Sequence, residues 1–267
     1  PVGSYSASFT FAPIASGTTT VSVTASGFGT GSFNGGSYAS SKSVTVSLAA
    51  ISLPSNVQVG SGLQVQMTGS LQASNDGGIT VKIASSDATK LLISPDGVTA
   101  GQPFIDVFVN NGTSSFSFYV LGVAGATGSP TVTASTTDTQ FTSGSAAVAV
   151  VEPELLYSSL PTSEAATSAD AAFEVGTYVP GYGYEAVAAG TSLVVTISTS
   201  NAAVADLTTS SQTQTTPVTV TLSAGQESSP SSVSLGGVAL HAVGTGTAII
   251  NATAAGVQSA SQTVTLD

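Results

Sequence analysis

Cysteine and arginine are absent from this chain of 267 residues, and lysine occurs only as Lys42, Lys82 and Lys90. Without cysteine there can be neither a disulfide nor a thiolate metal site, so each folded unit must depend on its hydrophobic core alone. Three basic residues against 14 acidic ones give a formal charge of -11. Phosphate binding needs clustered Lys and Arg, and this excludes nucleic acid as a partner.

Charge of either sign is scarce, at 6% of residues against about 25% in an ordinary soluble domain. The surface is instead expected to consist of Ser, Thr, Gln and Asn side chains, which are hydrated but repel neighbouring chains weakly. Such a surface favours a long-lived extracellular material whose chains pack side by side. No apolar run of membrane-spanning length occurs, so we expect no membrane insertion within this segment. No signal peptide or lipid motif is present either, and any targeting segment is expected outside this sequence.

An internal repeat organises what is present. Residues 3–26 align without a gap with residues 112–135, and Phe9 falls on Phe118. A third copy of the same pattern lies at 233–254. Matches among Ser, Thr and Ala mean little in this composition, but aromatic and aliphatic matches in phase are informative. Repeats at fixed spacing decide the fold before any other feature.

The spacing of the copies predicts three units, with boundaries at 1–49, 50–151 and 152–267. The second and third units each begin just before a related tetrapeptide, SLPS at 52–55 and SLPT at 159–162. The first unit contains only the last few strands of a repeat. We therefore expect two complete domains and the C-terminal part of another.

Hydrophobic residues alternate with polar ones in most segments, as in ITVKI, FSFYV and VTVTL. A period of two places one face of a strand on a core and the other in water. Gly, Asn, Asp and Ser separate these segments and are typical of turns. The pattern predicts an all-β protein of tandem immunoglobulin-like antiparallel β-sandwiches. The residues expected in the cores include Ile83, Phe118, Val120, Ile197 and Val220.

The incomplete first unit cannot bury its apolar face with its own strands. The residues concerned are Phe9, Phe11, Ile14, Val21 and Val23. A bare sheet edge also pairs readily with other strands. We expect residues 3–26 to contact polypeptide beyond the first unit. Its source is either an upstream part of the same parent chain or a neighbouring copy that donates strands.

The order of motifs, from SLP[ST] through TVKIASSD or VTISTSN to GVAGATGSPTVTAS or AVGTGTAIINATAAG and a closing VTL strand, resembles bacterial immunoglobulin-like (Big-type) repeats. Such repeats occur in large secreted cell-surface proteins. The resemblance implies an extracellular, cell-surface location and a tandem array, and it brings no catalytic residue. The partners it implies are other copies of the chain or further repeats of the same parent chain.

These features favour a non-enzymatic structural segment of an extracellular surface assembly, such as a surface layer, a sheath, a fibre or filament, or an adhesin stalk. The alternative is a glycan- or surface-binding adhesin module. For a hydrolase the chain offers one histidine, His241 in VALHAV, and no G-x-S-x-G motif. Hydrolysis by nucleophilic attack needs a nucleophile, a base and an orienting acid. We therefore expect no enzyme and assign no catalytic residue.

Two acids at the boundary between the second and third units are candidate metal ligands. Glu152 and Glu154 flank Pro153, and carboxylate oxygens suit a hard cation such as calcium. Two interpretations of the pair are open, a calcium ion held between neighbouring units or a solvated acid pair. No other cofactor is expected.

Aromatic residues gather in two glycine-rich loops. Tyr178, Tyr182 and Tyr184 lie in TYVPGYGYEA, and Phe28 and Phe33 lie in the long loop of the first unit. Exposed rings can stack on a sugar or anchor a protein partner. Alternatively, the tyrosine loop folds back on its own sandwich.

Asn111 and Asn251 each begin an N-x-[ST] sequon, which makes them candidate glycosylation sites. Asn111 is expected in a turn, where an enzyme can reach it, and Asn251 within a strand.

Overall fold

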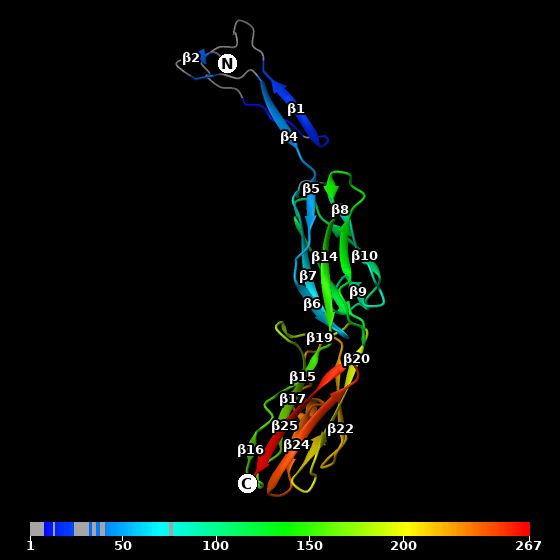
Figure 1. Cartoon of the computed structure of the whole chain (residues 1–267), viewed down its shortest axis with the longest axis vertical. Coiled ribbons are helices and arrows are strands. Elements are labelled where there is room, and N and C mark those ends of the chain that lie inside the picture. The colour runs from blue at the N-terminus through cyan, green and yellow to red at the C-terminus, as the bar shows by residue number, and fades with distance from the viewer. Residues whose placement is uncertain (1–7, 13, 24–31, 34–35, 38–40, 75–76) are drawn as a thin grey trace.

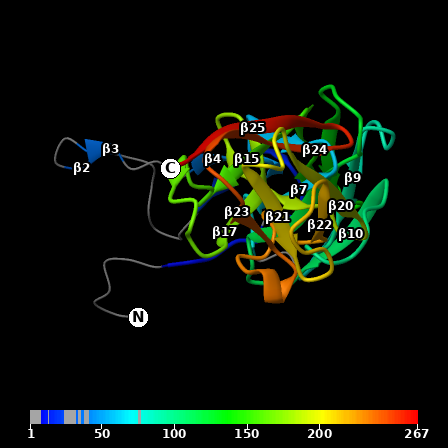
Figure 2. The same cartoon turned by 90° about the horizontal axis from the view of Figure 1, so that it is seen from below.

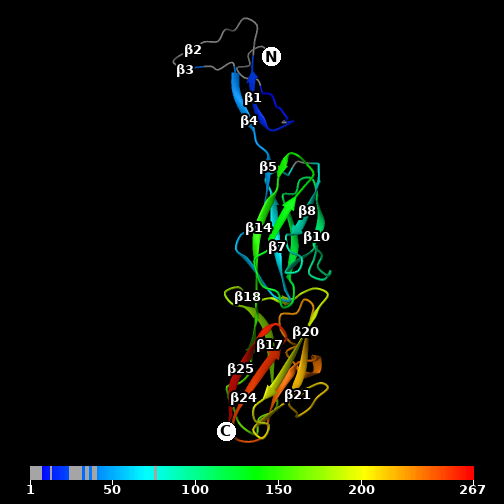
Figure 3. The ribbon, with the colours of Figure 1, turned by 45° about the vertical axis from the view of Figure 1, so that its right-hand side comes forward.

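The computed structural model of the chain describes residues 8–12, 14–23, 32–33, 36–37, 41–74 and 77–267. The three units follow one another along the long axis of the molecule (Figure 1), and a second direction gives the same arrangement (Figure 3). Seen along that axis, the second and third units overlie one another (Figure 2).

The second unit is a sandwich of two sheets. The order in one sheet is β10 (Phe104–Val109), β8 (Ile79–Ser85), β12 (Thr131–Ser135), β14 (Gly144–Val151) and β6 (Val57–Gly60). The order in the other is β13 (Phe141–Thr142), β5 (Ala49–Ser52), β7 (Leu63–Leu71), β11 (Ser115–Gly122) and β9 (Leu91–Ser94). Most neighbours are antiparallel, but β6 runs parallel to β14 and β13 runs parallel to β5.

The third unit repeats this plan in one continuous strand order. The order is β21 (Ala205–Thr209), β23 (Val238–Ala242), β17 (Ala171–Val179), β15 (Glu154–Ser158), β25 (Val257–Leu266), β24 (Gly246–Ala254), β20 (Ser192–Thr199) and β22 (Val218–Ser223). Two short strands lie beside it, β16 (Ser163–Glu164) on β25 and β18 (Gly183–Tyr184) on β17. Strands β21, β23, β17 and β15 form one face of this sandwich, and β25, β24, β20 and β22 form the other. A single bridge between β15 and β25, Glu154 with Gln258, connects the two faces.

The repeat predicted which strands of the two sandwiches correspond. Segment 81–85 lies in β8, between β10 and β12, and segment 194–198 lies in β20, between β22 and β24. The strands that follow in each sheet also correspond, since β12 and β14 occupy the positions in the second unit that β24 and β25 occupy in the third. The all-β immunoglobulin-like fold expected from the alternation is confirmed.

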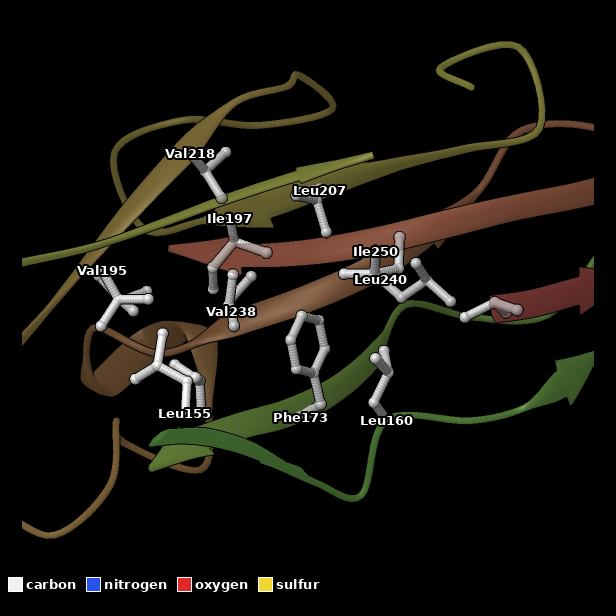
Figure 4. Close-up of a cluster of buried hydrophobic side chains, with 14 of the residues drawn as sticks. Leu155, Leu160, Phe173, Val195, Ile197, Leu207, Val218, Val238, Leu240 and Ile250 are labelled. Atoms are coloured by element: carbon white, nitrogen blue, oxygen red, sulfur yellow. The ribbon is translucent and has the colours of Figure 1, made fainter. Parts of the chain in front are cut away.

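Burial follows the alternation of the sequence. Buried and exposed residues alternate along ITVKI in β8 and along VTVTLS in β22. The five predicted core residues are at most 2% exposed. In the third unit, side chains from β15, β17, β20, β23 and β24 converge on Phe173 (Figure 4). Each complete sandwich therefore has its own apolar core.

One segment departs from the expected pattern. The third copy begins at residue 233, which aligns with the start of β11 in the second unit. The chain there forms a 3-10 turn, η1 (Val233–Leu235), and β23 begins only at Val238. Gly236 adopts a positive φ of 95° at the end of this turn, a conformation that glycine adopts without steric cost. The expected strand is thus shortened from its N-terminal side.

In the first unit, β1 (Gly17–Ser22) pairs with β4 (Ser41–Val46), and β2 (Ser32–Phe33) pairs with β3 (Gly36–Ser37). Of the apolar residues expected on its open face, Val21 is half-buried and the other four are exposed, Phe9 at 62%, Phe11 at 56%, Ile14 at 91% and Val23 at 56%. The described residues of this chain leave that face open, and its cover by an upstream part of the parent chain or by a neighbouring copy stays a prediction.

None of the described residues belongs to a helix with the length and apolar character needed to cross a membrane.

Phe118 offers a direct test of the second core, since its ring is fully buried and stacks on Phe116 with centroids 6.2 Å apart. Replacing Phe118 by Ala should lower the free energy of unfolding by ~3–5 kcal/mol. Ser117→Ala, on the exposed face of the same strand, should change it by less than about 0.5 kcal/mol. Denaturant unfolding measures both, and equal effects of the two substitutions would contradict the assigned strand orientation.

Candidate functional site: the joint between the second and third sandwiches

The loop at 177–190 leaves the third sandwich and joins the second. Within it, β19 (Ala186–Val187) pairs antiparallel with β7, so that Ala186 faces Gln64 and Val187 faces Leu63. A strand formed by the third unit therefore extends a sheet of the second. The loop lies at the junction in both side views (Figures 1 and 3).

Main-chain and amide hydrogen bonds fix this loop. The N–H of Ala188 donates to the carbonyl of Gly62 at 2.9 Å. The side chain of Gln64 is only 6% exposed. Its Oε1 accepts from the N–H of Ala189 at 2.8 Å, and its Nε2 donates to the carbonyl of Gly97 at 2.9 Å. One buried amide thus ties the loop to the second sandwich and satisfies its own polar atoms.

Apolar contacts join the same two units. Leu63 belongs to the second unit by sequence, but it packs in the core cluster of the third, together with Val179 and Val187. A smaller cluster joins Leu121 of β11 to Ala188 and Ala189 of the loop. The two sandwiches therefore share buried apolar surface, which stabilises their contact by about 25 cal/mol for each Å² removed from water.

Glycines permit the close approach at this end of the second unit. A Cβ on Gly122 would overlap the carbonyl of Gly60, and a Cβ on Gly60 would lie 2.5 Å from Leu63 Cδ1. The N–H of Gly62 donates to the carbonyl of Gly122 at 2.9 Å, and that of Ser61 to Val151 at 2.8 Å. Larger residues at 60 and 122 would separate the chain segments that support the joint.

Glu185 places a carboxyl group inside the joint. Its residue is 7% exposed, and its Oε2 accepts a hydrogen bond from the N–H of Gly60 at 2.8 Å. Burial raises the pKa of this carboxyl to about 7, and the Gly60 hydrogen bond acts in the opposite direction. Burial dominates because removing a carboxylate from water disfavours its charged form.

The three predicted tyrosines lie in or beside this loop with different roles. Tyr182 is 52% exposed, and its hydroxyl donates to the carbonyl of Asn56 in the second unit at 2.8 Å. Tyr178 and Tyr184 pack edge to face with centroids 5.5 Å apart. From the sequence we expect the loop either to expose its rings to a partner or to fold back on its own sandwich. It packs on its own sandwich through Tyr178 and Tyr184, and it contacts the neighbouring sandwich through Tyr182, whose ring stays exposed.

A groove of about 590 Å³ opens beside Tyr182. Both units line it, and its walls are Leu53, Ser55, Asn56, Val57, Gln58, Ser129, Ser145, Ala146, Ala147, Ala149 and Tyr182. Within the described part of the chain, the side chains of Asn56, Gln58, Ser129 and Ser145 form no hydrogen bond. The groove thus presents free hydroxyl and amide groups beside an exposed aromatic ring.

Glu152 and Glu154 lie near the joint without forming a cluster. Glu152 is exposed, and Gln258 Nε2 donates to its Oε2 at 3.4 Å. Glu154 is half-buried and pairs through its backbone with Tyr178 and Gln258. Among residues the structure describes, no three acidic or histidine side chains gather as metal ligands. The calcium site stays a prediction.

The remaining predicted residues lie elsewhere. Asn111 is exposed in a turn, where its Oδ1 accepts from the N–H of Gly77 at 3.0 Å, and Asn251 is half-buried in β24. Phe33 lies in β2, and Phe28 lies outside the described residues. The joint does not bring Asn111 or Asn251 to the tyrosines.

A second titratable cluster lies in the third sandwich. His241 Nδ1 and Asp170 Oδ1 are 2.7 Å apart, and Asp206 is the cross-strand neighbour of His241. Burial raises the pKa of Asp206, a shift that His241 opposes and Asp170 reinforces. Its Oδ1 is buried without a hydrogen-bond partner. In the described chain, no serine or threonine hydroxyl hydrogen-bonds to these groups.

No protein-family model matches this chain, and no curated protein matches it. Similar solved structures include the adhesin InvE of Yersinia pseudotuberculosis, at 12% identity over 82% of this chain and 58% of that one, with a TM-score of 0.32. Red sea bream transglutaminase matches at 12% identity over 84% and 32%, with a TM-score of 0.27. A family 2 glycosyl hydrolase of Bacteroides cellulosilyticus matches at 11% identity over 78% and 23%, again with a TM-score of 0.27. The chain spans less than two thirds of each of these structures.

Leu63 tests the coupling of the two sandwiches. Leu63→Ala removes a fully buried side chain from the third core and should lower the free energy of unfolding by ~2–5 kcal/mol. Because Leu63 is also the residue of β7 that pairs with Val187 of β19, the substitution should weaken the contact between the two units. The two units should then unfold in distinct transitions.

Leu71→Ala is the matched control, since Leu71 lies on the same strand but in the second core alone. It should destabilise the second unit and leave the joint intact. Differential scanning calorimetry distinguishes these outcomes, and identical unfolding profiles for the two variants would contradict the assigned role of Leu63.

Proposed function

We propose that this chain is a non-enzymatic, rod-forming segment of an extracellular surface protein built from tandem immunoglobulin-like domains. The observation that carries the proposal is the joint, where β19 of the third sandwich extends a sheet of the second. A sheet that crosses from one unit to the next resists bending, which suits a surface layer, fibre or adhesin stalk. The resemblance to bacterial immunoglobulin-like repeats and the low charge support a cell-surface location.

The proposed partners are further repeats of the same parent chain, and the first unit supplies their docking surface. A groove of about 220 Å³ there is lined by Phe9, Phe11, Val21, Val23, Ser41, Lys42 and Val44. In the second unit, the residues aligned with Phe9 and Val23 are Phe118 and Val132, and both are fully buried. Covering an exposed apolar side chain is worth about 1.5–3 kcal/mol, so strands of a preceding repeat would bind this face firmly.

The rod proposal predicts an elongated particle in solution. Small-angle scattering of the wild-type chain should give the pair-distance distribution of a rod, with the second and third units held at one angle. The double variant Leu63→Ala/Gln64→Ala should broaden that distribution, because it removes both the apolar and the amide contact of β19.

A compact wild-type globule would contradict the proposal. The same measurement over a concentration series separates the partner sources. An apparent mass that rises with concentration indicates that a second copy covers the first unit, and a constant mass favours repeats of the parent chain.

A second candidate function is a glycan-binding module at the groove beside Tyr182. The observation that favours it is the exposed ring next to free amide and hydroxyl groups. Rings of this kind stack on the apolar face of a sugar, and polar groups around them fix its hydroxyls.

Tyr182 provides the test of this candidate. Tyr182→Ala should abolish binding to a glycan identified by array screening, because the stacking surface is lost. Tyr184→Ala is the control, since Tyr184 is 44% exposed but lies outside the groove. Equal affinity of the Tyr182→Ala variant and the wild type, or no glycan bound by the wild type, would exclude this function.

A further inference from the structure

Glu185 stands apart from every other charged residue of the described chain. It is the only acidic or basic side chain among the buried residues there. It lies between β18 and β19, in the loop that docks on the second sandwich. Its burial therefore depends on the two units being in contact.

No opposite charge compensates for this burial. The carboxyl receives the N–H of Gly60 at 2.8 Å, on a side of the second unit where β6 and β7 carry no acidic or basic residue. The titratable groups on the elements of the third unit around it are Glu174 and Tyr178 on β17, Glu154 on β15 opposite Tyr178, Tyr184 on β18, and Glu227, whose carbonyl accepts from Thr177. Only burial and the Gly60 hydrogen bond shift the pKa of Glu185.

A neutral carboxyl is compatible with such a site, but a carboxylate held there by one N–H loses most of its hydration. We propose that Glu185 makes the joint between the second and third sandwiches a proton-responsive hinge, which docks firmly while the carboxyl is neutral and loosens when it ionises. This inference rests on the proposed rod function, since it describes how the stiffness of that rod varies with pH.

The direction follows from linkage. In the docked joint the pKa of Glu185 is raised to about 7, above the ordinary value of 4.5 that we expect once the loop is undocked and the carboxyl meets water. The docked state therefore binds the proton more tightly than the open state. Docking is strongest below pH 4.5, weakens as the pH rises towards 7, and changes no further above it.

Two amides report on opening because their hydrogen bonds cross the joint. The N–H of Ala188 donates to Gly62, and the N–H of Ala189 donates to Gln64. Hydrogen exchange detects rare opening even when the docked state dominates. Opening of the joint frees both amides while the core of each sandwich stays protected.

The experiment measures hydrogen-exchange protection factors of Ala188 and Ala189 in the full chain at pH 5 and pH 7.5, corrected for intrinsic rates. In the wild type both should fall about 50-fold over this range. In Glu185→Gln, which keeps the shape and an acceptor for Gly60, they should be independent of pH. The amide of Ile197, in the core strand β20, should not respond in either protein.

Glu174→Gln is the matched control, because Glu174 is an acid of the same strand β17 that pairs with Ser158 of its own unit. It should retain the wild-type dependence on pH. Wild-type protection that is constant between pH 5 and 7.5, or a dependence that survives in Glu185→Gln, overturns the proposal.

If Glu185→Gln fails to fold, the carboxyl carbon resonance of Glu185 in the wild type decides instead, since a midpoint below pH 5 overturns the hinge. Neither result affects the rod proposal, which small-angle scattering at a single pH tests independently.

Discussion

The pairing of β19 with β7 is the contact on which the arrangement of the complete sandwiches depends. It makes two residues of the third unit part of a sheet of the second, and it seats Leu63 of the second unit in the core of the third. Separating the units would break sheet hydrogen bonds and expose apolar side chains from both. The close approach of Gly60 and Gly122 permits this pairing, because side chains there would displace the turn that carries Leu63.

The scarcity of charge explains how the joint is built. Among the described residues, Lys90 forms an ion pair with Asp87 and His241 hydrogen-bonds to Asp170, and neither contact lies in the loop at 177–190. The joint relies on main-chain amides, one buried glutamine and small apolar residues. Such contacts are insensitive to salt, since they involve no charges for ions to screen. Of the residues that the structure describes, Glu185 is the one charged side chain buried in the joint. The chain has only three lysines, and none of them is among the groups that shift the pKa of Glu185.

Local patterns predicted the fold but not the joint. The alternation in ITVKI and VTVTLS reflects burial on one face of a strand, so it identified β8, β22 and the core positions correctly. The loop at 177–190 carried a weaker signal, an insertion relative to the second unit that is rich in Gly and Tyr. Its partner strand lies more than a hundred residues away in the sequence, and no periodicity within the loop specifies that contact. A lone glutamate in such a loop also looks solvated until the neighbouring domain is placed against it.

The junction between the first and second units is built differently. There the N–H of Ala49 donates to the carbonyl of Gln140, the N–H of Ala50 donates to Oε1 of Gln72, and the N–H of Gln72 donates to the carbonyl of Ala50. All three bonds lie in the second sandwich, where β5 begins. A hollow of about 390 Å³ lies between the units, bordered by Leu48, Phe141 and others. In the described residues no strand of the first unit pairs with the second. In the proposed rod, resistance to bending would therefore be concentrated at the joint that holds Glu185, where β19 pairs with β7.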